Sequence, residues 1–462
     1  MNPLLNRRTL LQRGAHGFGW LALNAMLAGA TKASQPHFKP RAKNVILLFM
    51  DGGVSHVDTF DPKPLLRKEH GQPFKMKIEA TQFDSNGHVL GNLWDYRRYG
   101  QSGIEVSDLF PRIGSLIDDI CVVRSMKVDF PEHAQATLML HCGHPLQGRP
   151  SLGSWLSYGL GSENSNLPSY AVVSGGMVPL GGVENFGSGF LPATHQASTF
   201  DAFSGGEAIP NITSSEAPTK QLGKLDFIAA SDRAYLHTLG NANVAVDAAI
   251  RNYETAFAMQ SAVPELTELS GESELTKRLY GLDSTDKLKA QYGRQLLLAR
   301  RMVERGVRCV EVGYVRGIRN VAPWDQHGSL KAHHEQNALI VDQPIAALLA
   351  DLKARGLLDS TLVIWAGEFG RTPFAQGSDG RDHNPQGFTI WLAGGGVKGG
   401  MTYGATDEYG YKAVEDIVTM PDLHATILHL MGINHKRLTF EHGGRDYRLT
   451  DVHGEVIHHI IS

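Results

Sequence analysis

The stretch NVILLFMDGGVSHVDTFDPKP, residues 44–64, decides the fold of this chain. Residues 45–50 form a continuous apolar run, which is typical of a strand buried on both faces of a parallel sheet. The run ends at Asp51, and the two glycines that follow let the backbone turn sharply and approach another group closely. Open α/β sheets bind ligands at the carboxyl ends of such strands. The stretch therefore predicts a central strand that delivers a functional carboxylate, although Asp-Gly is also common in simple turns.

Strand-like and helix-like segments alternate along the rest of the chain. Apolar runs predict strands at residues 120–123, 170–173, 307–315, 361–365 and 388–392, and helical spacing marks residues 109–117, 133–143, 284–305, 341–354 and 422–430. This alternation favours an α/β fold with a doubly wound, mostly parallel sheet flanked by helices. Residues 64–103 are polar and rich in glycine, so we expect a long loop on the active-site side. A Gly/Ser-rich insertion at about 151–285 is expected to shape a pocket wall.

The composition narrows the class of protein. A chain of 462 residues with 42% hydrophobic residues can form one large domain, which we place at residues 40–462. The formal net charge of −3 gives no basic footprint for nucleic acid, so we expect no nucleic-acid partner. Three cysteines are too few for a disulfide framework, although one pair could form.

The N-terminus predicts an export signal. Arg7 and Arg8 form a twin-arginine pattern, and an apolar stretch at 18–30 leads to small residues that suit signal peptidase. The alternative is a membrane anchor, but the apolar stretch is shorter than the roughly 20 residues that a bilayer span needs. We therefore expect a signal peptide at 1–33, export through the twin-arginine machinery to the periplasm or the exterior, and no stable membrane span.

Candidate ligands gather in three further motifs. WDQHG at 324–328 places Asp325 and His327 two residues apart, so that both can face one ion. AGEFGRTP at 366–373 repeats the pattern of the first strand, with Glu368 among glycines after an apolar run, and RDHNP at 381–385 contributes His383. Each motif alone also fits a solvated turn. Four motifs at successive strand ends favour a metal site instead, with the predicted ligands Asp51, Asp325, His327, Glu368 and His383.

The donor types indicate which ion such a site would take. Carboxylates and imidazoles together suit a divalent transition metal, so we expect zinc or manganese, with calcium as an alternative.

Three more residues are candidates for the chemistry. His133 lies in the first turn of the predicted helix, where the helix dipole favours anions and lowers the pKa of a histidine. A neutral imidazole there could be a ligand, a base or a nucleophile, or it could simply face solvent. His56 follows Asp51 closely and is a second acid–base candidate. The planar fork of Arg371 matches phosphate or sulfate oxygens.

The order of these motifs resembles the alkaline phosphatase/sulfatase superfamily and, more closely, the sulfatase-like DUF1501 family. The resemblance extends from residue 44 nearly to the C-terminus. Asp51 resembles the carboxylate after the first strand, and residues 130–145 resemble the segment that carries the nucleophile at a helix start. Asp325 and His327 resemble the Asp/His ligand pair, and His383 resembles the last histidine ligand.

The sequence departs from the superfamily pattern at two places. Glu368 and Phe369 stand in GEFG where the superfamily usually has Ser-Asp-His-Gly. No Cys, Ser or Thr is in register at the nucleophile position; His133 is nearest, and Thr137 lies one turn further into the helix. Without a Cys-x-Pro-x-Arg segment, the chemistry of a formylglycine sulfatase is not expected.

The resemblance implies an exported, metal-dependent hydrolase of phosphate or sulfate esters, whose anionic ester substrate could be a sulfated or phosphorylated glycan. Metal-activated water would attack, with His133 or His56 as general acid or base and Arg371 neutralising charge. Attack by His133 itself, through a phosphohistidine, is the alternative route. An alternative from another class is a non-catalytic, metal-binding or envelope-associated protein of the same fold. A phosphomutase-type isomerase is a third hypothesis.

Overall fold

A computed structural model describes residues 35–462 apart from 82, 84, 203–206, 239–243 and 315–321. Residues 1–34, which include the predicted twin-arginine signal, lie outside the described residues, so export stays a prediction. Among the helices of the described part, none is both long enough and apolar enough to cross a bilayer.

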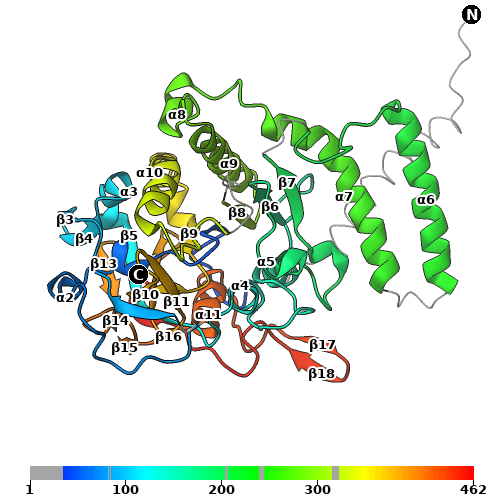
Figure 1. Ribbon diagram of the computed structural model, residues 1–462. Helices are drawn as coiled ribbons and strands as arrows, with labels where there is room; N and C mark the ends of the chain where they lie inside the picture. The colour runs from blue at the N-terminus through cyan, green and yellow to red at the C-terminus, as the bar shows by residue number, and fades with distance from the viewer. Residues whose placement is uncertain (1–34, 82, 84, 203–206, 239–243, 315–321) are drawn as a thin grey trace, which may run out of the picture.

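A nine-stranded sheet lies at the centre of the described residues (Figure 1). Across the sheet the strands are β13 (Met401–Tyr403), β5 (Ile120–Lys127), β12 (Phe388–Ala393), β9 (Thr361–Ala366), β1 (Asn44–Phe49), β8 (Cys309–Gly313), β6 (Tyr170–Ser174) and β7 (Ser198–Asp201), and β16 (Val418–Thr419) also pairs with β5. Neighbours are parallel except at β12, which is antiparallel to both β5 and β9. The predicted α/β fold with a mostly parallel sheet is confirmed.

Helices cover both faces of this sheet, which explains the continuous apolar run of β1. Ile46 and Leu48 belong to one apolar core, while Val45 and Leu47 belong to a second core on the opposite face. The first core includes residues of α9 (Lys287–Glu304) and α10 (Leu330–Ala354), and the second includes residues of α4 (His133–Cys142), α5 (Leu152–Leu160) and α11 (Met420–Leu430). A strand with alternate residues in two cores needs apolar side chains at every position.

Helix boundaries differ from the predictions where polar residues interrupt the pattern. Helix α10 begins at Leu330, well before the predicted residue 341. The prediction missed its first half because that half is largely polar and Pro344 lies in the interior of the helix. Asp286, not Ser284, caps α9, since its side chain accepts from the backbone N–H groups of Leu288 and Lys289.

The helix predicted at 109–117 is shorter than expected. Only α3 (Pro111–Gly114) is α-helical, and a 3-10 turn, η2 (Ile117–Asp119), follows it. The apolar side chains of this segment pack into the first core from two short turns. The prediction of one continuous helix is wrong.

The predicted loop at 64–103 also contains regular structure. It includes α2 (Pro64–Lys68), β2 (Asn86–Val89) and β3 (Tyr96–Tyr99), and β3 forms a hairpin with β4 (Ile104–Ser107). Strand β2 joins a separate three-stranded sheet with β10 (Gly370–Gln376) and β11 (Gly380–Asn384). These strands are short, and those of the predicted loop are mostly polar, so the apolar pattern did not reveal them. His383 therefore lies on β11 of this small sheet, not at the end of a central strand.

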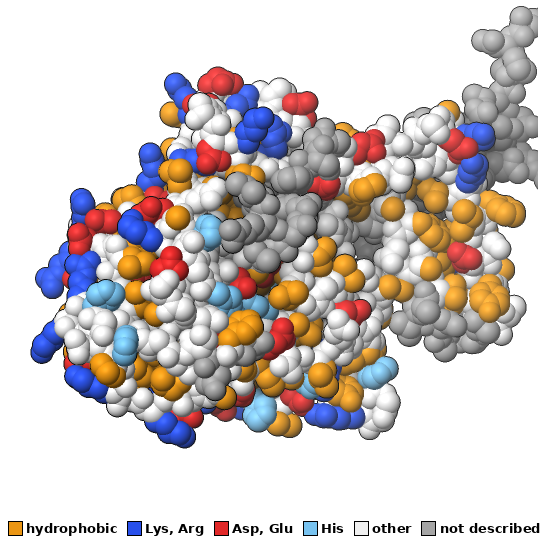
Figure 2. Space-filling view, in the orientation of Figure 1, with side chains coloured by type: hydrophobic (Ala, Val, Ile, Leu, Met, Phe, Trp, Pro, Cys, Tyr) orange, Lys and Arg blue, Asp and Glu red, His pale blue; other side chains and the backbone are white. Residues whose placement is uncertain are grey.

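The segment predicted as an insertion contributes both to the sheet and to the periphery. Strands β6 and β7 extend the central sheet, whereas α6 (Pro218–Thr238), α7 (Val244–Thr267) and α8 (Glu274–Leu279) lie outside it (Figure 1). Apolar side chains gather on the exposed surface of α6 (Figure 2), namely Leu222, Phe227, Ile228 and Tyr235. The boundaries of the insertion stay a prediction.

Two small hairpins lie outside the two larger sheets. One hairpin pairs β14 (Ala405–Thr406) with β15 (Ala413–Glu415), and the other pairs β17 (Phe440–His442) with β18 (Arg445–Tyr447). Cys121, Cys142 and Cys309 are all buried and unpaired.

Candidate metal centre

The turn after β1 brings distant segments of the chain into contact. Gly52 has a φ of +112°, and a Cβ at this position would lie 2.5 Å from the backbone nitrogen of Asp325. The N–H of Trp324 donates to the Asp51 carbonyl at 3.0 Å, and the N–H of Gly52 donates to Glu368 Oε1 at 3.0 Å. The glycine predicted for a close approach is therefore required, and what it approaches is the segment that carries Asp325.

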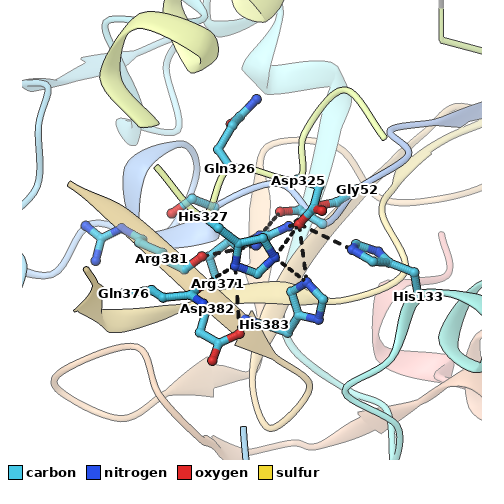
Figure 3. A network of polar contacts seen from close by, with 12 residues as sticks. Gly52, His133, Asp325, Gln326, His327, Arg371, Gln376, Arg381, Asp382 and His383 are labelled. Carbon is cyan, nitrogen blue, oxygen red and sulfur yellow. Dashed lines mark hydrogen bonds and ion pairs between the residues drawn. The ribbon is translucent and has the colours of Figure 1, made fainter. Parts of the chain in front are cut away.

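Three imidazoles and one carboxylate converge beside this turn (Figure 3). One ligand atom from each of His133, Asp325, His327 and His383 lies within 4.8 Å of the other three. Asp325 Oδ1 is 2.8 Å from the Nε2 of His327 and 3.3 Å from the Nε2 atoms of His133 and His383. The structure thus brings together three of the five predicted ligands and adds His133, which the sequence suggested mainly as a catalytic group.

Each of the three imidazoles is held through its other ring nitrogen. The Nδ1 atoms contact Glu368 Oε1 at 2.5 Å from His133, the Pro131 carbonyl at 2.5 Å from His383, and Gln376 Oε1 from His327. An acceptor at Nδ1 keeps a proton there and leaves the Nε2 atom free to bind a cation. Three such nitrogens and a carboxylate directed at one point form the arrangement of a metal site with its supporting contacts.

The charges of the centre follow from its carboxylates. Burial lowers the pKa of His133, but hydrogen bonding and charge interaction with Asp325 and Glu368 outweigh it and raise the pKa to about 9. The prediction that the helix start lowers this pKa is wrong, because two carboxylates outweigh the helix terminus. Burial, assisted by the charge of Arg371, lowers the pKa of His383 to about 3 against the opposing hydrogen bond with Asp325.

Asp325 is ionised in this setting. Burial alone would raise the pKa of its carboxyl group, but the close contacts with His133, His327 and His383 and the charge of Arg371 hold the pKa well below its usual range. A carboxylate that stays ionised at every working pH suits a metal ligand.

Arg371 supports the carboxylate of Asp325. Its side chain is fully buried, and its Nη2 donates to Asp325 Oδ1 at 2.6 Å. Its Nε donates to the Gly53 carbonyl at 2.9 Å, its Nη1 donates to the Arg381 carbonyl at 3.1 Å, and Nη2 also donates to the Gly52 carbonyl. All three guanidinium nitrogens therefore donate to groups of the protein. Arg371 supports the Asp325 carboxylate and does not present its guanidinium group to an anionic ligand.

Asp51 and Glu368 lie next to the four-residue group but outside it. Both oxygens of Glu368 accept from the backbone N–H groups of Gly52 and Gly53, and one also accepts from His133. Asp51 is buried, and its Oδ1 has no hydrogen-bond partner among the described residues. Burial and the neighbouring charge of Glu368 raise the pKa of Asp51 to about 7. Glu368 thus orients His133, whereas Asp51 keeps an uncommitted oxygen.

His56 lies apart from the other candidates. It begins the 3-10 turn η1 (His56–Asp58), is buried, and its Nε2 contacts the Gly410 carbonyl at 2.7 Å. Burial lowers the pKa of His56. Its hydrogen bond therefore joins the β1 turn to the loop between β14 and β15, and it does not reach the four converging residues.

Two phenylalanines form the walls of the centre. The ring of Phe369 lies 4.9 Å from the ring of His133 and 4.4 Å from that of His383, and Phe83 lies 4.9 Å from His327. The side chains of Asp325 and His327 are 20% and 24% exposed, whereas that of His383 is 3% exposed. The centre is therefore open to solvent at Asp325 and His327, and Phe83 places the segment 64–103 at its rim, as predicted.

Two supporting groups had no signal in the sequence. Gln376 ends β10 as one polar residue among several, and Pro131 contributes only its backbone carbonyl. A backbone acceptor leaves no trace in residue type, and a lone glutamine is not a metal-type residue. The role of Glu368 could have been suspected from its place after β9, but not its contact with His133.

Several solved structures are similar to this chain at low sequence identity. A sulfatase from Pseudoalteromonas sp., PsFucS1, shares 13% identity over 90% of this chain and 71% of its own, with a TM-score of 0.34. The phosphonate monoester hydrolase of Agrobacterium radiobacter shares 12% identity over 85% of this chain and 74% of its own, with a TM-score of 0.38. The C-terminal periplasmic domain of EcEptC from Escherichia coli, solved with zinc, shares 8% identity over 86% and 85%, with a TM-score of 0.35.

Sequence comparison gives a clearer result. No curated protein matches this chain. Residues 42–461 match the family described as "Protein of unknown function (DUF1501)", which is nearly the whole of the predicted domain. The chain belongs to the DUF1501 family.

Proposed function

We propose that this protein is a metal-dependent hydrolase of phosphate or sulfate esters, with its metal held by His133, Asp325, His327 and His383. The observation that supports the metal site is the paired use of the imidazole nitrogens. Each Nδ1 atom has a fixed acceptor, and the three Nε2 atoms lie beside one carboxylate. Without a cation, three imidazole nitrogens crowd one carboxylate oxygen, and the buried Nε2 of His133 lies 3.3 Å from Asp325 Oδ1 without the geometry of a hydrogen bond.

The separations of the ligand atoms suit a small divalent ion. Zinc binds histidine nitrogen at about 2.0–2.1 Å, which puts the ligand atoms of a tetrahedral site about 3.3 Å apart. Asp325 Oδ1 lies 2.8–3.3 Å from the three Nε2 atoms, and the Nε2 atoms of His327 and His383 are 3.0 Å apart. Three imidazoles favour zinc or manganese over calcium, which prefers oxygen ligands.

The residues of the chain would divide the work as follows. A bound divalent cation lowers the pKa of water towards about 7 and stabilises charge on an anionic ester. Glu368 orients His133, Arg371 holds the carboxylate of Asp325, and Phe369 shields the inner side of the centre from water. The open side at His327 admits the substrate. His133 acts in this proposal as a ligand, so a phosphohistidine route would require it to leave the metal.

The roles that the sequence suggested for Arg371 and His56 change in this proposal. Arg371 acts as a positioning residue, since its donors are directed at Asp325 and at backbone carbonyls. His56 stabilises the loop at Gly410 and has no part in proton transfer. Asp51 is the acid–base candidate that remains, because its Oδ1 is uncommitted and lies beside the centre.

Metal analysis and an ester panel test the proposal together. Purified protein should hold about one divalent ion per chain, and the double variant His327→Ala/His383→Ala should hold none. Replacement of the exposed His237 and His453 by alanine is the matched control and should leave metal content unchanged. Wild-type protein should hydrolyse an aryl sulfate, an aryl phosphate or an aryl phosphonate, and the double variant should not.

The second candidate function is a non-catalytic metal-binding or envelope-associated protein. The fourth protein ligand favours it, because structural zinc sites have four protein ligands and catalytic ones usually keep an open position. If the protein binds its metal stoichiometrically and turns over no ester in the panel, this second function replaces the hydrolase.

Location is proposed from the same residues that predicted it. The twin arginines and the apolar stretch 18–30 support export in the folded state to the periplasm or the exterior. The substrate would then be an anionic ester outside the cytoplasm, for example a sulfated or phosphorylated glycan.

A further inference from the structure

A second cavity lies away from the metal centre, between α7, α9 and the end of β7. Its volume is about 660 Å³, within the range of pockets that bind small molecules. Apolar side chains line much of it, with Val263 from α7 and Leu298 from α9 among them. Such a cavity can bury the apolar body of an organic ligand.

One face of α9 supplies the polar side of this cavity. Lys287, Gln291, Arg294 and Leu298 all line it, and their spacing of four, three and four residues places them on one helix face. Lys287 and Arg294 are exposed, and neither side chain has an ion-pair or hydrogen-bond partner among the described residues. Seven residues of helix separate the two cations by about 10 Å.

The acidic side chains of the cavity come from a different element. Asp201 ends β7, and Glu207 lies in the segment that follows β7. Among the described residues, no ion pair joins Lys287 or Arg294 to an acidic side chain. The two cations on α9 therefore stay available to an anionic ligand.

The cavity lies at the same edge of the sheet as the metal centre, because Asp201, at the carboxyl end of β7, lines it. Gln295 of α9 donates to the carbonyls of Val173 and Gly313, which lie at the carboxyl ends of β6 and β8. Strands β7 and β1 are three positions apart in a parallel part of the sheet, or about 14 Å at the usual strand spacing. Crevices at this edge are where open α/β sheets bind ligands.

We propose that this cavity binds an amphipathic organic dianion, with an apolar body and two acidic groups about 10 Å apart. The apolar walls take the body, and Lys287 and Arg294 each take one acidic group. Gln291, between them, donates to an oxygen of the ligand. This site is separate from the metal centre and does not depend on ester hydrolysis.

Three carboxylates of defined length test the proposal by isothermal titration calorimetry. Decanedioate has an apolar chain and two carboxylates at a comparable separation, decanoate lacks the second charge, and butanedioate lacks the length. Wild-type protein should bind decanedioate most tightly. The variant His327→Ala/His383→Ala should bind it equally well, which separates the cavity from chelation at the metal centre.

Removing the two cations should weaken that binding. Lys287→Gln/Arg294→Gln should lower the affinity for decanedioate about 5- to 30-fold, from about 0.5–1 kcal/mol for each ion pair. Lys68→Gln/Arg278→Gln removes the same charge outside the cavity and should change the affinity little. Ala290→Phe keeps both cations but fills the cavity, and it should also weaken the binding of decanedioate. This second variant tests the proposal even if Lys287→Gln/Arg294→Gln does not fold.

Three results would overturn the proposal. Equal affinities for decanedioate and decanoate would show that the second cation has no role. Equal losses in the cavity pair and in the control pair would reduce the effect to overall charge. Loss of binding in His327→Ala/His383→Ala would move the ligand to the metal centre.

Discussion

Replacing Gln376 with leucine tests the metal centre through a residue that touches no metal. Gln376 Oε1 accepts the Nδ1–H of His327, and the rings of Phe83 and His383 lie 4.9 Å and 4.8 Å from this imidazole. Leucine has nearly the same size but no acceptor. The His327 ring is then free to turn, and its proton can move to Nε2, where it competes with the metal.

The expected loss follows from the role of such supporting contacts. Removing the partner of a metal-bound histidine lowers metal affinity about 10- to 100-fold, or about 1.4–2.7 kcal/mol. At a free metal concentration 100 times the wild-type Kd, the metal stabilises the folded protein by about 2.7 kcal/mol. A tenfold weaker variant would keep only about 1.4 kcal/mol of that stabilisation.

Calorimetric titration of metal into metal-free protein measures the affinity, and thermal unfolding with and without metal measures the stabilisation. Gln376→Glu is the matched control, since it keeps an acceptor oxygen beside His327 and should bind metal at least as tightly as the wild type. The metal-free forms of all three proteins should unfold at similar temperatures, because Gln376 lies at a half-exposed strand end. Equal metal affinity in wild type and Gln376→Leu would refute the assignment of His327 as a ligand.

Two further predictions rest on the geometry of the centre, and a third rests on the N-terminal sequence. Because the metal-free pKa of His133 is about 9, metal binding below pH 9 must release a proton, and the apparent metal affinity should fall about tenfold between pH 8 and pH 7. Calorimetry in buffers of different ionisation enthalpy should count close to one released proton. A count of zero would contradict the role of His133 as a ligand. Gly52→Ala should destabilise the protein by more than about 1–3 kcal/mol and abolish metal binding, since its Cβ would meet the backbone of the 324–325 segment. Gly71 also has a positive φ but has open space around it, so Gly71→Ala is the control that reports the backbone strain alone in thermal unfolding. Replacing Arg7 and Arg8 with lysine should keep the protein in the cytoplasm in a cell-fractionation assay, and unchanged export would reject the twin-arginine signal.

The central fold could be predicted because the strands that form it carry a strong signal. Strand β1 is buried on both faces and therefore apolar at every position, and α4 ends at Gly143, whose φ of +67° marks the stop that the sequence predicted. The direction of β12 could not be read in the same way. A strand buried on both faces has the same composition whether it runs parallel or antiparallel, so the pattern does not record its orientation.

The small sheet that carries His383 was out of reach for a different reason. Strands β2 and β11 are short and contain polar residues such as Asn86 and Arg381, so they show no alternation. What holds β11 in place is a buried ion pair, in which Arg381 Nε donates to Asp58 Oδ2 at 2.7 Å. Such a pairing between residues more than 300 positions apart leaves no local signal in the sequence.

The ligands themselves were partly predictable. Asp325 and His327 were identified by their two-residue spacing, and the structure places their atoms 2.8 Å apart. His133 was identified as functional but with the wrong electrostatics, since its pKa is raised by residues 192 and 235 positions away. Local sequence reports the helix start at which a histidine lies, whereas its charge state depends on side chains that only the folded chain brings close.

The two places at which the sequence departs from the superfamily pattern are in contact in the structure, because Glu368 and Phe369 both touch His133. Glu368 contacts both the glycine N–H groups of the β1 turn and Nδ1 of His133, while the neighbouring Phe369 has no donor and packs against the rings of His133 and His383. Together they turn His133 so that its Nε2 faces Asp325. In the proposed site His133, which is nearest the nucleophile position of the resemblance, is thus committed as a ligand, and it takes the place that a histidine at 369 would fill. In the proposed hydrolase the nucleophile is then water, and the metal content and the ester panel decide between hydrolase and binding protein.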